Sequence, residues 1–294
     1  MNILITGSTG FIGGHVVKEM SRRGHWITTF DRCRNTSPLV HSALCGDIRD
    51  EEAVAEGVRG NELVIHAAAV LGTQELIEKP HLALDINTGG TINVLNGCRT
   101  HDSRMLLVSK PNIWLNTYSI SKAAAEKFCE MYSREFDLVV QIAKPFNVYG
   151  PGERVGPGHV VKAIPTMITN ALAGRTLSIY GSGNQTNDFV HVSDVVRILA
   201  ELSEVEINGY QEYEIGTGTD RSVNELGQLI LKFTGSDSEI EHTPSRIGET
   251  PDDRVLADIS ALVQTVGPQS FIDLEEGLPE TVSYYRNLLG QESK

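Results

Sequence analysis

The feature that most constrains the fold is a short apolar run near the start of the chain, followed at once by spaced glycines. Residues 3–5 predict a strand buried on both faces. Gly7, Gly10 and Gly13 follow, and residues 11–23 have a helical pattern. Such glycines permit a tight turn, let the backbone approach a pyrophosphate and let a helix pack on its strand. The amides of the helix start would hold the anion, although the G-x-x-G-x-x-G spacing also suits a purely structural turn.

The end of the next expected strand supports a dinucleotide. Residues 26–30 predict a strand, and Asp31 follows it. The aspartate stands near the ~20-residue spacing at which a carboxylate accepts hydrogen bonds from the adenosine ribose. This position favours NAD over NADP. A solvated turn acid is the alternative reading, and Arg32 and Arg34 keep a 2′-phosphate ligand open.

Strand and helix patterns alternate through the first half of the chain, which predicts an α/β fold with a doubly wound parallel sheet of the Rossmann type. Right-handed crossovers place helices on both faces of such a sheet. Further strands are expected at 44–48, 63–69, 105–109 and 138–143, and helices at 50–58, 81–99 and 118–135.

A stretch rich in glycine and proline, residues 150–158, predicts a boundary between two parts of the chain. We expect a dinucleotide-binding domain over 1–150 and a smaller substrate-binding lobe over 151–294, interleaved with the first. Helices are expected in the second part at 160–172, from a capping box at Ser222 to Phe233, and at 274–289.

Composition narrows the class of function. The chain has 294 residues, 40% of them hydrophobic, and a net charge of −13. This charge argues against nucleic acid and anionic membranes as partners and favours a small-molecule ligand. We see no basic leader and no run of about 18 apolar residues, so a cytoplasmic protein is expected. The four cysteines lack metal or disulfide spacing, and no metal site is expected.

The best catalytic candidates are Tyr118 and Lys122, which are four residues apart on an expected helix. Side chains at this spacing share one face. An ammonium near a phenol favours the phenolate, so Tyr118 could exchange a proton with a sugar or alcohol hydroxyl while hydride moves to nicotinamide. The same pair also occurs by chance in structural helices.

An ordered set of motifs now resembles a known family. The motifs are residues 7–13, Asp47-Ile48, His66 to Ala69, Asn87, Tyr118-x-x-x-Lys122, 144–151, 179–183, 188–194, 246–249 and 257–260. Together they resemble the extended short-chain dehydrogenase/reductase family, in its NAD-dependent nucleotide-sugar epimerase and dehydratase branch.

The resemblance implies NAD as cofactor, a nucleotide sugar as substrate and a homodimer formed by the helices from His81 and from Tyr118. Asp47 and Ile48 would flank the adenine, and Arg246 would hold the substrate pyrophosphate. With the spacing argument, the expected cofactor contacts are Gly7, Gly10, Phe11, Ile12, Gly13, Asp31, Arg32, Asp47, Ile48, Ala67, Ala68, Ala69, Tyr118, Lys122 and Pro145. The expected substrate contacts are Asn147, Tyr180 and Arg246.

The chain departs from the family pattern on the substrate side. Lys110 follows Ser109 where the family has a serine or threonine that bonds the reacting hydroxyl. We therefore assign this catalytic role to Ser109 first and to Thr117 second. The acidic pair of the dehydratases is missing from residues 111–113, which argues against 4,6-dehydration, and Asn187 replaces a second pyrophosphate arginine.

The favoured function is an NAD-dependent 4-epimerase that acts on a nucleotide sugar through a transient keto-sugar. A decarboxylase, a dehydratase or a reductase on a related nucleotide sugar is the enzymatic alternative. A dinucleotide-binding protein with weakened turnover is the alternative from a different class. His66 is expected to pack beside the cofactor.

Overall fold

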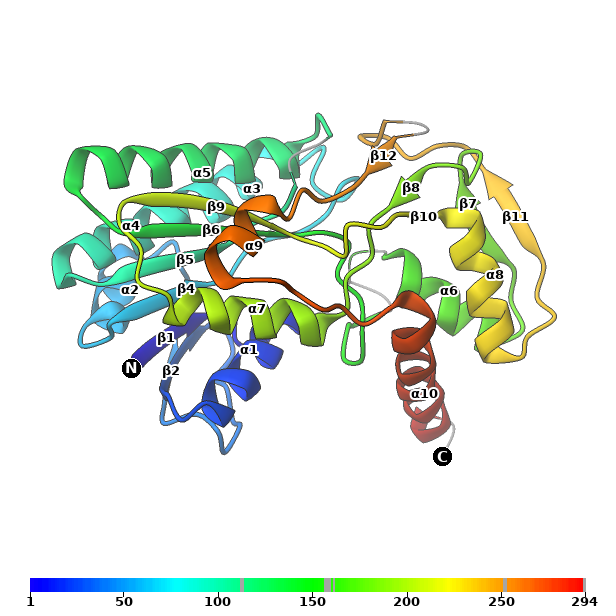
Figure 1. Ribbon diagram of the computed structural model, residues 1–294, viewed down its shortest axis with the longest axis horizontal. Coiled ribbons are helices and arrows are strands. Elements are labelled where there is room, and N and C mark those ends of the chain that lie inside the picture. The colour runs from blue at the N-terminus through cyan, green and yellow to red at the C-terminus, as the bar shows by residue number, and fades with distance from the viewer. Residues whose placement is uncertain (112–113, 156–159, 161, 251–252, 293–294) are drawn as a thin grey trace.

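The computed structural model describes residues 1–111, 114–155, 160, 162–250 and 253–292. Its main element is a seven-stranded parallel sheet in the order β3-β2-β1-β4-β5-β6-β9 (Figure 1). The strands are β1 (Asn2–Thr6), β2 (Trp26–Asp31), β3 (Ser42–Cys45), β4 (Leu63–His66), β5 (Arg104–Val108), β6 (Val140–Pro145) and β9 (Tyr210–Ile215). The expected doubly wound parallel sheet is confirmed.

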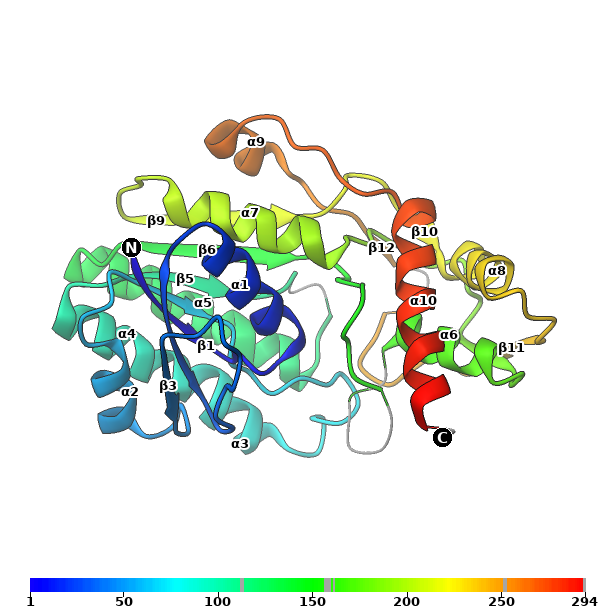
Figure 2. The ribbon, with the colours of Figure 1, turned by 90° about the horizontal axis from the view of Figure 1, so that it is seen from below.

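Helices cover both faces of this sheet because successive residues of a buried strand point to opposite sides. Ile3 and Ile5 of β1 pack in one core and Leu4 packs in the other. Figure 2 shows α1 and α7 side by side on one face. The helices of this first lobe are α1 (Phe11–Arg22), α2 (Glu51–Val58), α3 (Pro80–Ala83), α4 (Gly90–His101), α5 (Thr117–Phe136), α7 (Val192–Glu204) and α9 (Ser260–Val266).

The sequence pattern predicted one continuous helix over 81–99, but this segment contains a π-helical turn, η1 (Leu84–Gly89), between α3 and α4. Such turns are often found at functional sites. Asn87 lies in this turn, and its side chain donates to and accepts from the backbone of Val70 at 3.0 and 2.8 Å. It also donates to Ser121 Oγ at 3.0 Å. The π turn thus joins the loop after β4 to α5.

The strand expected at 44–48 ends earlier, at Cys45. Asp47 accepts a hydrogen bond from the Arg49 amide at 3.0 Å, and the Asp47 carbonyl accepts one from the Asp50 amide at 2.9 Å. These bonds form a turn, so Asp47 and Ile48 lie after β3 and before α2. Local side-chain bonds of aspartate compete with a strand in this way.

The second lobe lies to the right of the main sheet in Figure 1 and consists of helices and two small sheets. The capping box predicted at Ser222 is confirmed, since Ser222 and Glu225 bond each other's backbone amides. The elements of the second lobe are α6 (Ala163–Leu172), β7 (Leu177–Tyr180), β8 (Thr186–Asn187), β10 (Arg221–Ser222), α8 (Val223–Thr234), β11 (Ile240–Thr243), β12 (Arg254–Val255) and α10 (Leu274–Glu292).

Residues after 151 contribute to both lobes, because α7, β9 and α9 return to the main sheet. The sequence analysis did not single out these three elements. None of the helices in the described part of the chain is long and apolar enough to cross a membrane.

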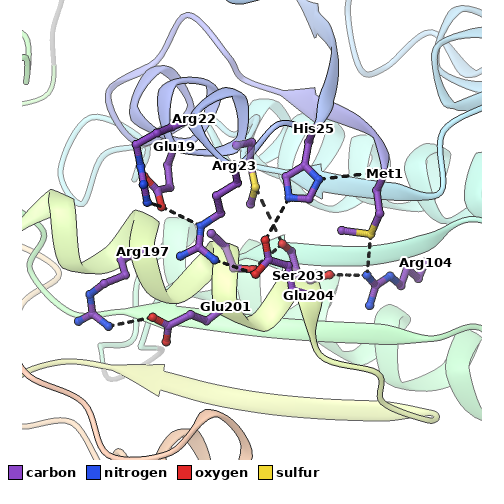
Figure 3. Close-up of polar contacts among 12 residues, drawn as sticks. Met1, Glu19, Arg22, Arg23, His25, Arg104, Arg197, Glu201, Ser203 and Glu204 are labelled. Atoms are coloured by element: carbon purple, nitrogen blue, oxygen red, sulfur yellow. Dashed lines mark hydrogen bonds and ion pairs between the residues drawn. The ribbon is translucent and has the colours of Figure 1, made fainter.

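A group of ion pairs joins α1 to α7 at the end of the sheet away from the glycine turn (Figure 3). Arg23 bonds Glu19 at 2.8 Å and Glu204 at 2.7 Å. His25 Nε2 lies 3.1 Å from the second oxygen of Glu204. The group fixes the C-terminal ends of both helices against the start of β1.

We predict that Glu19→Gln lowers the thermal stability at neutral pH. The hydrogen bond from Arg22 is the largest cause that lowers the pKa of Glu19, from 4.5 to about 2, against a smaller opposing effect of burial. A lowered carboxyl pKa stabilises the fold above the unfolded pKa, and this contribution is lost as the pH falls from about 4.5 to about 2. Thermal unfolding between about pH 7 and about pH 3 measures the difference.

The exposed Glu78→Gln is the matched control and is expected to unfold with the wild type throughout. A stability difference for Glu19→Gln that stays constant down to about pH 3 would contradict the prediction.

Candidate cofactor and substrate site

The turn between β1 and α1 is too tight for any residue except glycine at two positions. Gly7 has φ of 70°, and a Cβ there would lie 2.7 Å from the Ala68 amide nitrogen. A Cβ on Gly13 would lie 2.1 Å from the Gly7 carbonyl oxygen. Gly10 caps the start of α1 without a side chain, so the first amides of the helix keep their capacity to bind an anion. This cradle fits a dinucleotide pyrophosphate.

Asp31 lies at the end of β2, beside the same turn. Its Oδ2 accepts hydrogen bonds from the amide and the hydroxyl of Thr9, both at 2.9 Å. The carboxylate therefore also fastens the glycine turn. The hydrogen bond from Arg49 is the largest cause that lowers the pKa of Asp47, and the positive charge of exposed Arg32 adds a smaller effect, so Arg32 and Asp47 face one region.

We predict that Gly13→Ala weakens NAD binding about tenfold or more and lowers the free energy of unfolding by about 1–3 kcal/mol, because the new methyl group overlaps the Gly7 carbonyl. Gly14→Ala is the matched control. Its methyl group would lie 3.6 Å from Ser8 O, an ordinary contact, and alanine suits a helix better. Calorimetric titration with NAD and chemical unfolding test both; equal behaviour of the two variants would contradict the prediction.

His66 is the last residue of β4 and is fully buried. Its Nδ1 lies 2.7 Å from Thr6 Oγ1 and its Nε2 lies 3.2 Å from Thr91 Oγ1. Burial lowers the pKa of His66 to about 3, so the ring is neutral. Thr6 Oγ1 also accepts from the Ala68 amide at 3.2 Å, which holds the expected cofactor wall Ala67 to Ala69 against β1.

Tyr118 and Lys122 lie on the first turns of α5, whose start is capped by Asn116. Lys122 is buried and donates from Nζ to the Val108 carbonyl at 3.0 Å. Burial lowers the pKa of Lys122 to about 8, and the charge of Glu126 opposes this shift. Burial also raises the pKa of Tyr118, so it outweighs the lowering that the sequence analysis expected from Lys122.

Ser109 is buried at the end of β5, and its hydroxyl donates to Glu126. Glu126 lies 3.1 Å from Lys144, which also pairs with Glu212 at 2.5 Å. Ser109 is not among the described residues that line the cavity beside Tyr118. Its expected catalytic role stays a prediction, and Thr117, which donates to the Ile77 carbonyl at 3.5 Å, is likewise untested.

Lys110 occupies the place next to Tyr118. Its Nζ donates to Ser119 Oγ at 2.7 Å and lies 5.3 Å from the centre of the Tyr118 ring and 6.0 Å from that of Trp114. Burial lowers the pKa of Lys110 to about 8. Lys110 thus lies against the ring of Tyr118, although, like Ser109, it is not among the described residues that line the cavity.

A cavity of about 350 Å³ extends from Tyr118 into the second lobe. This volume lies in the range of small-molecule sites. All three expected substrate residues line it: Asn147 donates to Asn187 Oδ1 at 3.3 Å, and the Arg246 guanidinium lies 4.6 Å from the centre of the Tyr180 ring. Asn187, noted as a departure from the family pattern, therefore lies in the same cavity.

Sequence reasoning missed several residues of the cavity. Lys162 lines it just before α6, and Glu249 lines it while pairing with Arg246 at 3.5 Å. Trp114 lines it too and donates from Nε1 to Asp253 at 3.0 Å. These residues stand in loops without a repeating pattern, so only proximity in the fold reveals them.

Comparison with known proteins agrees with this geometry. The model of the NAD dependent epimerase/dehydratase family matches residues 3–110 and 111–216. The chain belongs to this family. The extended short-chain dehydrogenase/reductase resemblance is thereby confirmed, and NAD is the cofactor of the family.

Relatives in the family carry out different reactions. A UDP-N-acetyl-alpha-D-glucosaminuronate decarboxylase of Bacillus cytotoxicus is 30% identical over 97% of this chain and 98% of its own. The UDP-glucose 4-epimerase of Thermotoga maritima, solved with UDP-glucose, has a TM-score of 0.89 at 27% identity, over 98% of this chain and 100% of its own. MoeE5, solved with UDP-glucuronic acid and NAD, has a TM-score of 0.90 at 27% identity and the same coverage.

Proposed function

We propose that the protein is an NAD-dependent 4-epimerase of a nucleotide sugar. The observation that carries the proposal is the position of Tyr118, in the wall of a cavity that continues to Asn147, Tyr180 and Arg246. A sugar near Tyr118 and a diphosphate near Arg246 would fit a cavity that both residues line. Guanidinium suits a phosphate ligand because it donates in a planar fork.

In this proposal Tyr118 takes the proton of the sugar hydroxyl when the carbon is oxidised and returns it when the keto-sugar is reduced on its other face. Bound NAD would supply the hydride acceptor for the oxidation and the hydride donor for the reduction. Burial alone raises the pKa of Tyr118, so the proposal assigns to Lys122 the nearby positive charge that favours the phenolate. The keto-sugar stays in the cavity between the two half-reactions.

The cofactor contacts expected from the sequence complete the proposal. The glycine turn would hold the pyrophosphate, and Asp31 would accept from the ribose hydroxyls, with its Oδ2 already bonded to Thr9. Asp47 and Ile48 in the turn after β3 would flank the adenine. Phe11, Ile12 and Pro145 are proposed as further cofactor contacts on the same resemblance.

A panel of UDP- and dTDP-linked sugars, incubated with the NAD-loaded protein, tests the proposal. Chromatography of the products and release of carbon dioxide separate epimerisation from decarboxylation, and cofactor absorbance reports a net reduction. A C4 epimer formed without net NADH or carbon dioxide is expected. A protein that binds NAD but turns over no nucleotide sugar would contradict the proposal and favour a binding protein.

We predict that Tyr118→Phe lowers the rate on the identified substrate about a hundredfold to ten-thousandfold, because the variant cannot exchange the proton. NAD affinity and thermal stability are expected to remain near the wild-type values. Full activity in Tyr118→Phe would place the proton exchange elsewhere.

Ser109→Ala tests the catalytic role expected for that hydroxyl in the same assay. A loss of about tenfold or more with unchanged stability would support contact with the substrate. A loss of stability with unchanged turnover would instead fit the bond that Ser109 donates to buried Glu126.

We also propose a homodimer formed by α3, η1 and α5, which pack against one another and present apolar side chains to solvent. Leu84 of η1 is 41% exposed and Ile120 of α5 is 50% exposed. We predict that Ile120→Glu dissociates the dimer, whereas Leu39→Glu, on a loop outside these helices, does not. Light scattering measures the mass; a monomeric wild type would contradict the proposal.

A further inference from the structure

Positive charge gathers around Tyr118. Lys110, Lys122 and Lys162, named here the lysine cluster, run from buried Lys122 through half-buried Lys110 to exposed Lys162. The charges of Lys162 and Lys122 both disfavour the charged form of Lys110, so the three groups act on one another. Lys162 and Tyr118 line the same cavity.

Within the described part of the chain, the hydrogen bonds that Lys110 and Lys122 donate go to neutral groups. The lysine ion pairs found there are those of Lys127 and Lys144. Lys110 donates to a hydroxyl of Ser119, and Lys122 donates to a backbone carbonyl. An ammonium has three donors, so the bond to Ser119 leaves Lys110 further N–H groups for a ligand.

Carboxylates near the cavity are engaged with other groups. Glu126 attracts Lys110 and Lys122, but it pairs with Lys144 at 3.1 Å. Glu249 pairs with Arg246, and Asp253 accepts from the indole of Trp114. Burial raises the pKa of Glu153 to about 7 and the charge of Lys162 opposes this shift, so a further carboxylate faces the exposed end of the cluster. Among the described residues, no carboxylate forms an ion pair with Lys110 at the centre of the cluster.

We propose that the lysine cluster, with Lys110 at its centre, binds a carboxylate on the sugar ring, so that the substrate class is a nucleotide-linked hexuronate. The Lys110 ammonium lies over the Tyr118 ring, so its ligand stands next to the hydroxyl that the tyrosine serves. In a hexuronate the carboxylate is carried by C5, beside C4. Charge-assisted bonds to a carboxylate stabilise a partly buried ammonium, whereas a neutral hexose leaves its charge unbalanced. This inference rests on the proposed function.

Calorimetric titration of the NAD-loaded protein with UDP-glucuronate and UDP-glucose measures the preference, with the corresponding dTDP pair as a second nucleotide. We predict that the wild type binds the hexuronate about ten- to a hundredfold more tightly than the hexose, the range of a hydrogen bond to a charged group. In Lys110→Met the ratio of the hexose Kd to the hexuronate Kd is expected to fall close to one. Lys110→Arg keeps the charge and is expected to retain most of the ratio.

Lys127→Met is the matched control, because Lys127 lies on the same helix and pairs with Glu130 at the surface. It is expected to keep the wild-type ratio. NAD affinity and thermal unfolding of Lys110→Met establish that the variant is folded. A Lys162→Met variant, at the exposed end of the cluster, is expected to lower the ratio less than Lys110→Met.

A wild type that binds the hexose as tightly as the hexuronate would overturn the inference and leave the proposed function standing. Retention of the full preference in folded Lys110→Met would also overturn it. Failure to bind any of these nucleotide sugars would contradict the proposed function itself, and the inference would fall with it.

Discussion

The close approach of α1 to the end of β1 is the contact on which the rest of the structure depends. A side chain at Gly13 would overlap the Gly7 carbonyl, and one at Gly7 would overlap the backbone after β4. Three segments of the chain therefore meet at one point, where β1 ends. Asp31 draws β2 to the same point through Thr9. The carboxyl ends of parallel strands form the crevice in which such folds bind ligands, and here this geometry is set by the absence of two side chains.

A second constraint is the burial of charge along α5 and β6. Glu126 is accepted in the interior because Lys144 and the Ser109 hydroxyl satisfy it. Removal of one partner from a buried ion pair leaves the other charge uncompensated and lowers the free energy of unfolding by about 3–5 kcal/mol. The arrangement keeps a negative charge near Lys122 while burial disfavours its ammonium. The same carboxylate thus holds α5 to β5 and β6 and acts on the charge of Lys122.

Much of the first lobe could be predicted because its strands are uninterrupted apolar runs and its turns carry glycine or a capping aspartate. Residues 3–5 and the glycines after them are the clearest example. The end of β3 could not be predicted, because Asp47 forms a local turn inside an apolar run. The position of Ser109 could not be predicted either. Its place at the end of the strand led to the prediction of a catalytic hydroxyl, but its hydroxyl bonds Glu126, a partner 17 residues away that no local pattern indicates.

The chain passes repeatedly between the lobes, since α7, β9 and α9 lie in the first lobe while α8 and α10 lie in the second. Neither lobe is a continuous piece of sequence, so neither can be cut out and expressed by itself with its core complete. A single break in the backbone between β6 and α6 would leave the two lobes joined by the other connecting segments of the chain. We expect this threading to couple the two lobes during unfolding, so that a cofactor half and a substrate half do not melt separately.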